Sequence, residues 1–431
     1  MKSTPLHSQL LPLSILVGAF LLCVWLWTMS YIASEDVPKA TPQLQSRLSV
    51  EIQPFENTHS MPTDATKPED VVEVQDDELL SYVPDELLLK VGSKAEVVEL
   101  LQLAMANGGE FVDAVPALKT FRLRFASEAD AAAFRDQLGD AYQAENNYLV
   151  KAPDFPEYET RGESDQQALT GFGTNALDWL GVSGDHSEWG AGVLVAILDT
   201  GMYPHEAFDG INVSQLDLVG GRAEYSSYDS HGTAVASVST QVAPASDILS
   251  IRVLDAEGLG DSYTVASGIV IAVDSGASVI NLSVGSYSDS VVLSEAVAYA
   301  VNNGIAVIAA AGNDGSNAPS YPAAYEGVVG VSALDAEGHI ANFSNYGDAV
   351  DLAAPGVEIV AAWEQSSFVT MSGTSAAAPF VTGAVAALLS TGQAATGAEA
   401  ISLLESHAID LGTAGVDADF GYGALQLGGL F

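Results

Sequence analysis

The feature that most constrains the fold is a series of apolar runs of strand length that begins at residue 193. Helical stretches separate these runs. A strand that is apolar along its whole length, rather than at alternate positions, is typical of a parallel sheet buried on both faces. The alternation therefore predicts an α/β fold with a doubly wound, mostly parallel sheet and helices on both faces. The runs are residues 193–198, 248–253, 279–282, 305–310 and 328–333.

Residues 83–151 show a different pattern, in which strands and helices alternate twice. Ser93 stands at the expected start of the first helix, and Asn107-Gly108 stands at its end. Ser127 with Asp130 resembles a capping box for the second helix. The order strand-helix-strand, strand-helix-strand predicts a small ferredoxin-like α+β unit. Its strands are expected at residues 87–91, 111–112, 121–125 and 148–150.

The N-terminal 33 residues carry no formal charge between Lys2 and Glu35 and include an apolar run at residues 10–27. Such a run is long enough to span a bilayer. A cleaved signal peptide is the alternative, with Thr28-Met29-Ser30 as a weak small-residue cleavage site. Both interpretations predict an exported chain, either a membrane-anchored precursor or a secreted, extracellular protein.

Two further segments read as linkers. Residues 34–82 are rich in acidic residues and proline, and such a composition cannot bury enough apolar surface to offset the entropy lost on ordering. We expect an acidic disordered linker there. Residues 152–175 are irregular and polar, and we expect a processing linker. The large domain then occupies residues 176–431.

Composition excludes several kinds of site. The formal net charge is −42, which argues against nucleic acid as a partner because such proteins need a basic face. The acidity serves solubility, or attracts basic partners or Ca²⁺. A single cysteine, Cys23, rules out an intrachain disulfide and a zinc site with two cysteine ligands.

Four segments of the large domain carry reactive side chains in suggestive settings. Asp199 ends the first apolar strand, and His231 begins a helix of small residues. Asn313 follows the strand at residues 305–310, and Ser375 begins a long apolar helix. Each alone is also an ordinary strand end, turn or helix cap. Together they match acyl transfer, since ligands bind at the carboxyl ends of strands in open α/β sheets.

The chemistry needs all four groups. A serine hydroxyl becomes a nucleophile when a histidine takes its proton. The histidine needs a buried carboxylate to hold its tautomer and to stabilise the imidazolium. The oxyanion needs preorganised donors, which the Asn313 amide and the Ser375 backbone N–H could supply.

These segments resemble those of the subtilisin-like serine proteases, the subtilases. The family order is Asp, His, Asn, Ser, and this chain repeats it. The resemblance covers about residues 176–428, and residues 83–151 resemble the family's propeptide, a folding aid and temporary inhibitor. Further matching segments are residues 279–285, 321–323, 343–347, 354–356 and 421–423.

The resemblance implies a role for each site residue. Asp199 would orient His231, which would act as general base and then as acid, while Ser375 would be the nucleophile. Asn313 would complete the oxyanion hole. Ser283, Val284 and Gly285 would line the substrate cleft. Ala310, Ala311 and Gly312 would form a wall of the pocket for the side chain before the scissile bond.

The same resemblance implies polypeptide substrates, with the chain's own propeptide as a second partner. The chemistry needs no cofactor, and structural Ca²⁺ is compatible with the acidic composition. Some positions depart from the common family pattern. Ala376 follows the nucleophile where many members have Met, and the usual histidines are replaced by Ala234 and Phe380. The family's calcium-binding loops have no clear match.

Three alternatives differ in testable ways. A sedolisin-type acid peptidase would carry Glu in place of His231 and Asp in place of Asn313, and its activity would not rise through the ordinary titration range of histidine, ~6.5. An α/β-hydrolase would need a Gly-x-Ser-x-Gly elbow, which Ser375 lacks. An inactive subtilase-fold binding module would not react with a serine-directed fluorophosphonate.

Overall fold

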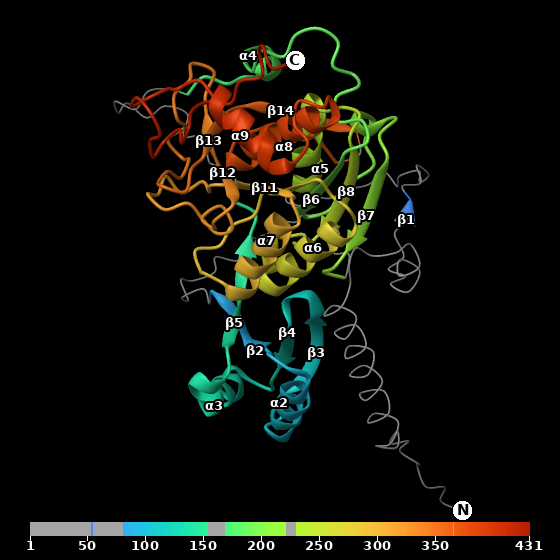
Figure 1. Cartoon of the computed structure of the whole chain (residues 1–431), viewed down its shortest axis with the longest axis vertical. Coiled ribbons are helices and arrows are strands. Elements are labelled where there is room, and N and C mark those ends of the chain that lie inside the picture. Colours follow the sequence, from blue (N-terminus) through green and yellow to red (C-terminus); the bar gives the residue numbers. More distant parts are fainter. Residues whose placement is uncertain (1–52, 55–80, 154–168, 221–229, 365) are drawn as a thin grey trace, which may run out of the picture. The chain divides into compact units, whose positions relative to one another are not determined.

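The structure is a computed structural model, and it describes residues 53–54, 81–153, 169–220, 230–364 and 366–431 (Figure 1). No helix within these ranges is long and apolar enough to cross a membrane. The predicted signal or anchor at residues 1–33 and most of the predicted linkers lie outside the described residues.

The chain forms two compact units. The small unit contains Leu87–Ala144, and the large unit contains Glu145–Phe431 together with the described part of Glu51–Glu86. The small unit is shorter than the predicted segment of residues 83–151. The difference arises at β5 (Ala144–Lys151), because residues 145–151 of this strand belong to the large unit.

The large unit is built on an eight-stranded sheet with the order β1-β7-β8-β6-β10-β11-β12-β13. The seven strands from β7 to β13 in this order are parallel, and β1 is antiparallel at the edge. The predicted parallel sheet is therefore confirmed. The strands are β1 (Gln53–Pro54), β6 (Leu194–Asp199), β7 (Val213–Asp217), β8 (Asp247–Arg252), β10 (Val279–Leu282), β11 (Ala306–Ala310), β12 (Val328–Leu334) and β13 (Leu352–Pro355).

Helices cover both faces of this sheet. Helices α6 and α7 pack against each other on one face, and α5 and α8 pack together on the other (Figure 1). Helix α6 contacts β6 and β8, whereas α8 contacts β10 through β13. The helices are α5 (His231–Val242), α6 (Ser262–Asp274), α7 (Val291–Asn302) and α8 (Thr374–Ser390).

Strand β6 shows why its sequence is apolar throughout. Successive side chains of a strand point to opposite faces of the sheet. Val195 and Ile197 are fully buried in the core cluster that includes α5 and α8. Leu198 points the other way, toward Gly268 of α6, where an added Cβ would come within 3.1 Å of Leu198. Both faces are buried, so the strand is apolar on both sides up to Asp199 at its end.

The other elements of the large unit surround this sheet. Strands β14 and β15 form an antiparallel hairpin, and α8 contacts α9 near the C-terminus. These elements are β9 (Leu259–Asp261), β14 (Ile359–Trp363), β15 (Ser367–Met371), α4 (Ala176–Trp179), α9 (Gly397–His407) and the 3₁₀ turn η3 (Glu206–Phe208).

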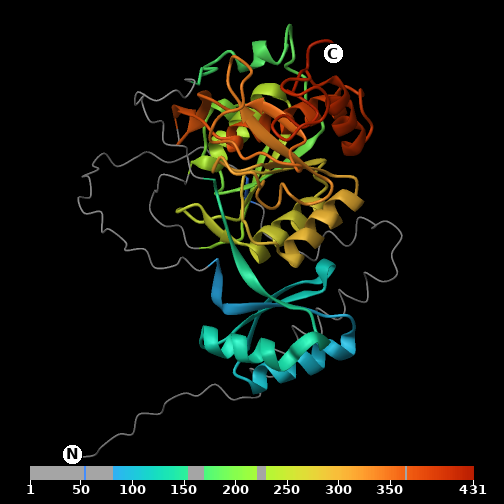
Figure 2. The same cartoon turned by 90° about the vertical axis from the view of Figure 1, so that its left-hand side faces the viewer.

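The small unit has the predicted order of strands and helices. Helices α2 and α3 lie on the same face of its sheet (Figure 2). Ser93 Oγ accepts a hydrogen bond from Glu96 N, and Ser127 Oγ accepts one from Asp130 N, which confirms both predicted caps. The elements are β2 (Tyr82–Lys90), α2 (Lys94–Ala106), β3 (Glu110–Val115), η1 (Pro116–Leu118), β4 (Thr120–Arg124), α3 (Glu128–Leu138) and η2 (Gly139–Ala141).

Asp351, next to β13, should make stability depend on pH. Burial raises the pKa of Asp351 to about 6, although its carboxylate accepts a hydrogen bond from Gly330 N at 2.8 Å. Between the ordinary carboxyl pKa, ~3.9, and about 6, the folded chain holds a proton that the unfolded chain releases. Stability therefore falls as pH rises through this window.

We expect Asp351→Asn to stabilise the chain above pH 7 by up to about 2–3 kcal/mol and to change little at pH 4, since only the ionised carboxylate is penalised. Thermal unfolding at both pH values measures the effect. Asp348→Asn, at an exposed position three residues away, is the control. A gain of the same size at pH 4 and pH 8 would contradict the prediction.

Candidate active site

Asp199 is the last residue of β6, at the carboxyl end of the central strand of the sheet. Its side chain is buried, and Oδ1 accepts a hydrogen bond from Thr200 N at 2.7 Å. The chain then turns sharply through Gly201, whose φ of 95° is in the region that favours glycine. The strand thus delivers a fixed carboxylate to the edge of the sheet where such folds bind ligands.

His231 is the first residue of α5 and is completely buried. Its Nδ1 lies 2.8 Å from Asp199 Oδ1 and 2.9 Å from Oδ2. The adjacent Gly232 allows this approach, because a Cβ there would meet Gly201 O at 2.2 Å. Gly232 N also donates to Thr200 Oγ1 at 3.1 Å. An imidazole that donates its Nδ1 proton to a carboxylate keeps Nε2 as its basic nitrogen.

Ser375 is the second residue of α8, and Gly373, with a φ of 144°, is the cap residue before the helix. The serine is buried, and its Oγ forms no hydrogen bond with any residue in the described part of the chain. Ser375 therefore does not donate a hydrogen bond to His231 in this structure. Hydrogen bonds between catalytic groups are often long before substrate binds and shorten in the complex with substrate. Ser375 N is among the first N–H groups of the helix, which lack an intrahelical acceptor.

Asn313 lies beside the start of α8. Its Oδ1 accepts hydrogen bonds from Thr374 N and Thr374 Oγ1, both at 2.9 Å. Thr374 Oγ1 also accepts from Gly312 N at 3.1 Å. The Nδ2 group of Asn313 faces Gly373, where an added Cβ would lie only 2.9 Å away. Thr374 thus links Asn313 to the start of the helix that carries Ser375, and the predicted place of Asn313 in an oxyanion hole stays a prediction.

The segment after β10 joins this region from the other side. Ser283 and Val284 are fully buried, and Ser283 Oγ lies 3.4 Å from the Ser375 carbonyl oxygen. Asn281 holds Ser283 Oγ through Nδ2 at 2.9 Å and accepts from Thr382 Oγ1 of α8 at 2.9 Å. These contacts fix the segment to the helix that carries Ser375.

Lys151, at the end of β5, pairs with Gly285 as an antiparallel strand would. Lys151 N donates to Gly285 O at 2.9 Å, and Gly285 N donates to Lys151 O at 2.8 Å. On its other edge β5 pairs with β9, and Ala152 N donates to Gly258 O at 2.8 Å. The segment after β10 therefore accepts an extended chain through backbone hydrogen bonds, the pattern of peptide binding by strand addition.

The three residues predicted to form a pocket wall follow β11 or end it. Ala310 and Ala311 are completely buried, and Ala311 N donates to Val331 O at 3.0 Å. Their small side chains and the adjacent Gly312 leave the loop closely packed. The predicted role as a pocket wall is not tested by these contacts and stays a prediction.

Two helix caps near this region were not predicted from the sequence. Glu145 accepts hydrogen bonds from Val291 N at 2.8 Å and Val292 N at 2.9 Å, at the start of α7. Asn147 Oδ1 accepts from Tyr263 N at 3.1 Å at the start of α6. No local pattern marks these residues, because their partners lie more than 100 positions away.

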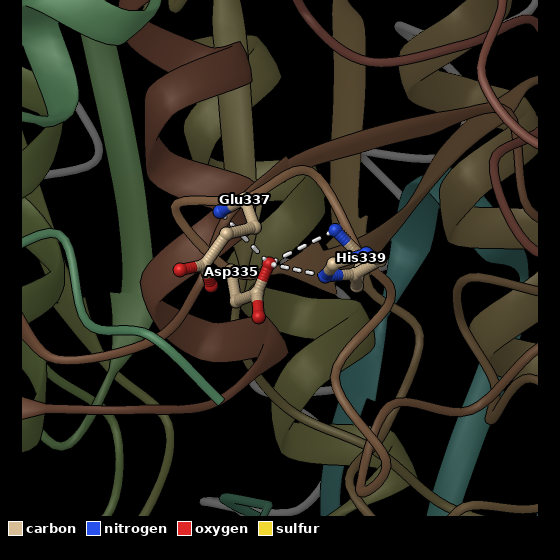
Figure 3. Close-up of side chains that lie close together, drawn as sticks. All are labelled: Asp335, Glu337 and His339. Atoms are coloured by element: carbon tan, nitrogen blue, oxygen red, sulfur yellow. Dashed lines mark hydrogen bonds and ion pairs between the residues drawn. The ribbon is translucent and has the colours of Figure 1, made fainter. Parts of the chain in front are cut away.

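One cluster could in principle hold a metal ion within the described residues: Asp335, Glu337 and His339 (Figure 3). Asp335 Oδ1 already accepts from Glu337 N at 3.1 Å and His339 N at 2.9 Å, and Oδ2 accepts from Thr170 N at 3.3 Å. Ca²⁺ prefers six to eight oxygen ligands. This set does not fit that ion, and Asp335 instead stabilises a turn.

Comparison with known proteins places these features in context. A family profile described as "Subtilase family" matches residues 190–423. The thermophilic serine proteinase of Bacillus sp. (strain AK1) is 38% identical over 264 residues, covering 58% of this chain and 63% of that protein. Thermitase of Thermoactinomyces vulgaris is 39% identical over 218 residues, covering 48% of this chain and 78% of that protein.

Two further matches extend the comparison. The minor extracellular protease Epr of Bacillus subtilis (strain 168) is 32% identical over 309 residues, covering 67% of this chain but only 46% of that protein. The crystal structure of fervidolysin from Fervidobacterium pennivorans, described as a keratinolytic enzyme related to subtilisin, aligns with a TM-score of 0.66 and 26% identity. That alignment covers 82% of this chain and 61% of fervidolysin.

Proposed function

This chain belongs to the subtilase family, and from that premise we propose that it is a serine endopeptidase that uses Asp199, His231 and Ser375. The observation that carries the proposal is the buried pair of Asp199 and His231, with Nδ1 2.8 Å from the carboxylate. A fully buried histidine held in this way is poised to take a proton through Nε2.

In the proposed reaction, Ser375 Oγ attacks the carbonyl carbon of the peptide bond while His231 Nε2 takes the hydroxyl proton. The proton then passes to the leaving amine, and an acyl-enzyme remains. In a second step water attacks the acyl carbon, again with His231 as general base; the bond to Ser375 Oγ then breaks, the proton passes from His231 to Oγ, and the acid product leaves. Asp199 keeps the imidazole in its tautomer and stabilises the imidazolium throughout.

The oxyanion of each tetrahedral intermediate would be bound by Asn313 Nδ2 and Ser375 N–H. Support comes from the two hydrogen bonds that Asn313 Oδ1 accepts from Thr374, which hold the amide beside the residue that precedes Ser375. The helix N-terminus adds a favourable potential for negative charge. Loss of one such donor typically costs about 2.7–4 kcal/mol of transition-state stabilisation.

Polypeptides are the proposed substrates. Lys151 shows how an extended chain pairs with Gly285, and Ser283 of the same segment contacts Ser375. Backbone pairing of this kind accepts many sequences, and side-chain preference would come from pockets such as the proposed wall at residues 310–312. The Epr relative is described as extracellular, and we propose that this chain is exported as well.

We also propose that residues 83–151 are a propeptide and that the chain cleaves itself between Lys151 and about Leu177. Lys151 occupies the strand position beside Gly285, and Ser283 of the same segment lies 3.4 Å from the carbonyl oxygen of Ser375. N-terminal sequencing of the mature form tests the proposal. A mature N-terminus at any position from 83 to 150 would contradict it.

Glu145 offers a way to measure propeptide retention. Burial raises the pKa of Glu145, while its hydrogen bonds to residues 290–292 oppose that rise. Removal of a helix cap costs about 0.5–2 kcal/mol, or roughly a 2- to 30-fold weaker association. We therefore expect Glu145→Ala, in the full chain, to shorten the lag before protease activity appears after processing.

Glu99→Ala, at an exposed position of α2, is the matched control and should leave the lag unchanged. An unchanged lag in Glu145→Ala with normal processing would show that the cap does not help retain the propeptide. A fluorophosphonate that labels Ser375 in the processed protein is the direct test of the proposed activity. Failure to label correctly processed, folded protein would favour an inactive binding module.

A further inference from the structure

Asn345 binds the loop that carries Asn313 on both sides of that residue. Asn345 is completely buried in the segment after β12. Its backbone N–H and its side-chain amide both bond to the backbone of residues 311–318. The partners are Gly312 O at 2.9 Å, Asp314 N and Ser316 N at 3.0 Å, Ala311 O at 3.1 Å and Ala318 O at 3.3 Å.

Gly312 packs directly against the Asn345 amide. A Cβ built on Gly312 would lie 2.3 Å from Asn345 Nδ2, and the φ of Gly312 is +112°. Glycine is needed there for both reasons, since a side chain would push the amide away and strain the backbone. The contact leaves little freedom in how the loop sits on Asn345.

Tyr287 closes the same network from the segment that follows Gly285. Its hydroxyl donates to Asp314 Oδ2 and accepts from Asn345 Nδ2 at 2.8 Å. Burial, together with the hydrogen bond to Asp314, raises the pKa of Tyr287 to about 12. The phenol therefore keeps the proton that it donates to Asp314, even where an ordinary tyrosine, pKa ~10, would lose it.

We propose that Asn345, assisted by Tyr287, is a positioning residue that sets the place of the Asn313 amide during catalysis. This role rests on the proposed function of Asn313 in the oxyanion hole. Asn345 touches neither the reacting groups nor the Asn313 side chain in these contacts. It acts through the backbone on each side of Asn313.

The need for such a residue follows from how Asn313 is held. Thr374 fixes the Oδ1 end of the amide. The position of Nδ2 also depends on the backbone, which has left-handed glycines at Gly312 and Gly315. A misplacement of about 1 Å at a catalytic group can cost about 10²-fold in rate. Asn345 removes the freedom that these glycines would otherwise allow.

A double-mutant cycle on protease processed from the full chain tests the proposal. We expect Asn313→Ala to lower kcat by about 10²- to 10³-fold. Asn345→Ala should lower kcat by about 10- to 100-fold with KM changed less than about twofold, because ground-state binding does not use the amide. In the Asn313→Ala background, Asn345→Ala should change kcat by less than about threefold.

Ser344→Ala is the matched control. Ser344 is also buried, but its Oγ bonds to Ala333 N and to Asn345 O rather than to residues 311–318. Its kcat should stay within about threefold of the unsubstituted protein. This control separates a general loss of packing near Asn345 from a specific effect on Asn313.

Several outcomes would overturn the proposal. One is that Asn345→Ala lowers kcat equally with Asn313 present and in the Asn313→Ala background. Another is that Asn345→Ala raises KM and leaves kcat unchanged. If Asn313→Ala itself left kcat unchanged, the proposed role of Asn313 would fail instead. If Asn345→Ala did not fold, Tyr287→Phe would decide the question. We expect Tyr287→Phe to lower kcat three- to tenfold when Asn313 is intact and to leave kcat unchanged in the Asn313→Ala background. No loss with Asn313 intact would overturn the proposal.

Discussion

Ser375→Ala is expected to lower kcat by about 10⁶-fold and to leave the full chain unprocessed. The side chain is the proposed nucleophile, so no acyl-enzyme forms without it. Alanine fits the site because Ser375 Oγ forms no hydrogen bond with the described residues that a methyl group would break. The fold should therefore survive, and the unprocessed length of the purified chain on a gel gives the readout together with peptide hydrolysis.

Ser267→Ala provides the control for this substitution. Ser267 lies on α6, and its Oγ donates only to the Tyr263 carbonyl oxygen among the hydrogen bonds of the described residues. Processing and kcat should be normal. If purified Ser375→Ala appeared at the mature length, another protease would carry out maturation. If it still hydrolysed peptides, Ser375 would not be the nucleophile.

The central strands could be predicted from the sequence because burial on both faces leaves a strong signal. The predicted strand at residues 279–282 coincides with β10, and the run at 328–333 lies within β12. Strand β7, which lies between the edge strand β1 and β8, was not predicted, since Ser214 and Gln215 make it look like a polar loop. Strand β2 begins at Tyr82 despite Pro84, a residue that usually argues against a strand interior.

The sequence predicts which residues form the candidate site, but it does not predict the contacts that hold them. Asp199, His231 and Asn313 stand beside strand ends and helix starts, where a single motif shows their setting. Asn345 was noted only within a matching segment, and nothing in that segment tells that its amide would bind the backbone on each side of Asn313. Such partners meet only when the chain folds, so spacing along the sequence carries no information about them.

The second large effect is expected at Asp199. Its two carboxylate oxygens lie 2.8 Å and 2.9 Å from His231 Nδ1, and Oδ1 also accepts from Thr200 N at 2.7 Å. In Asp199→Asn, the amide oxygen would keep the bond from Thr200 N, which turns the amino group toward His231. A donor at that place requires a lone pair on Nδ1, and the proton of the neutral imidazole must then sit on Nε2.

A protonated Nε2 cannot accept the proton of Ser375, so kcat of Asp199→Asn should fall by about 10⁴-fold while KM changes little. The loss should be smaller than that of Ser375→Ala, because the nucleophile remains. Asp247→Asn, at the start of β8 in the same sheet, makes the same chemical change at the opposite end of a strand and should leave kcat unchanged. A loss below tenfold in folded Asp199→Asn would mean that this carboxylate does not hold the tautomer, and the buried pair with His231 would then be a structural contact alone.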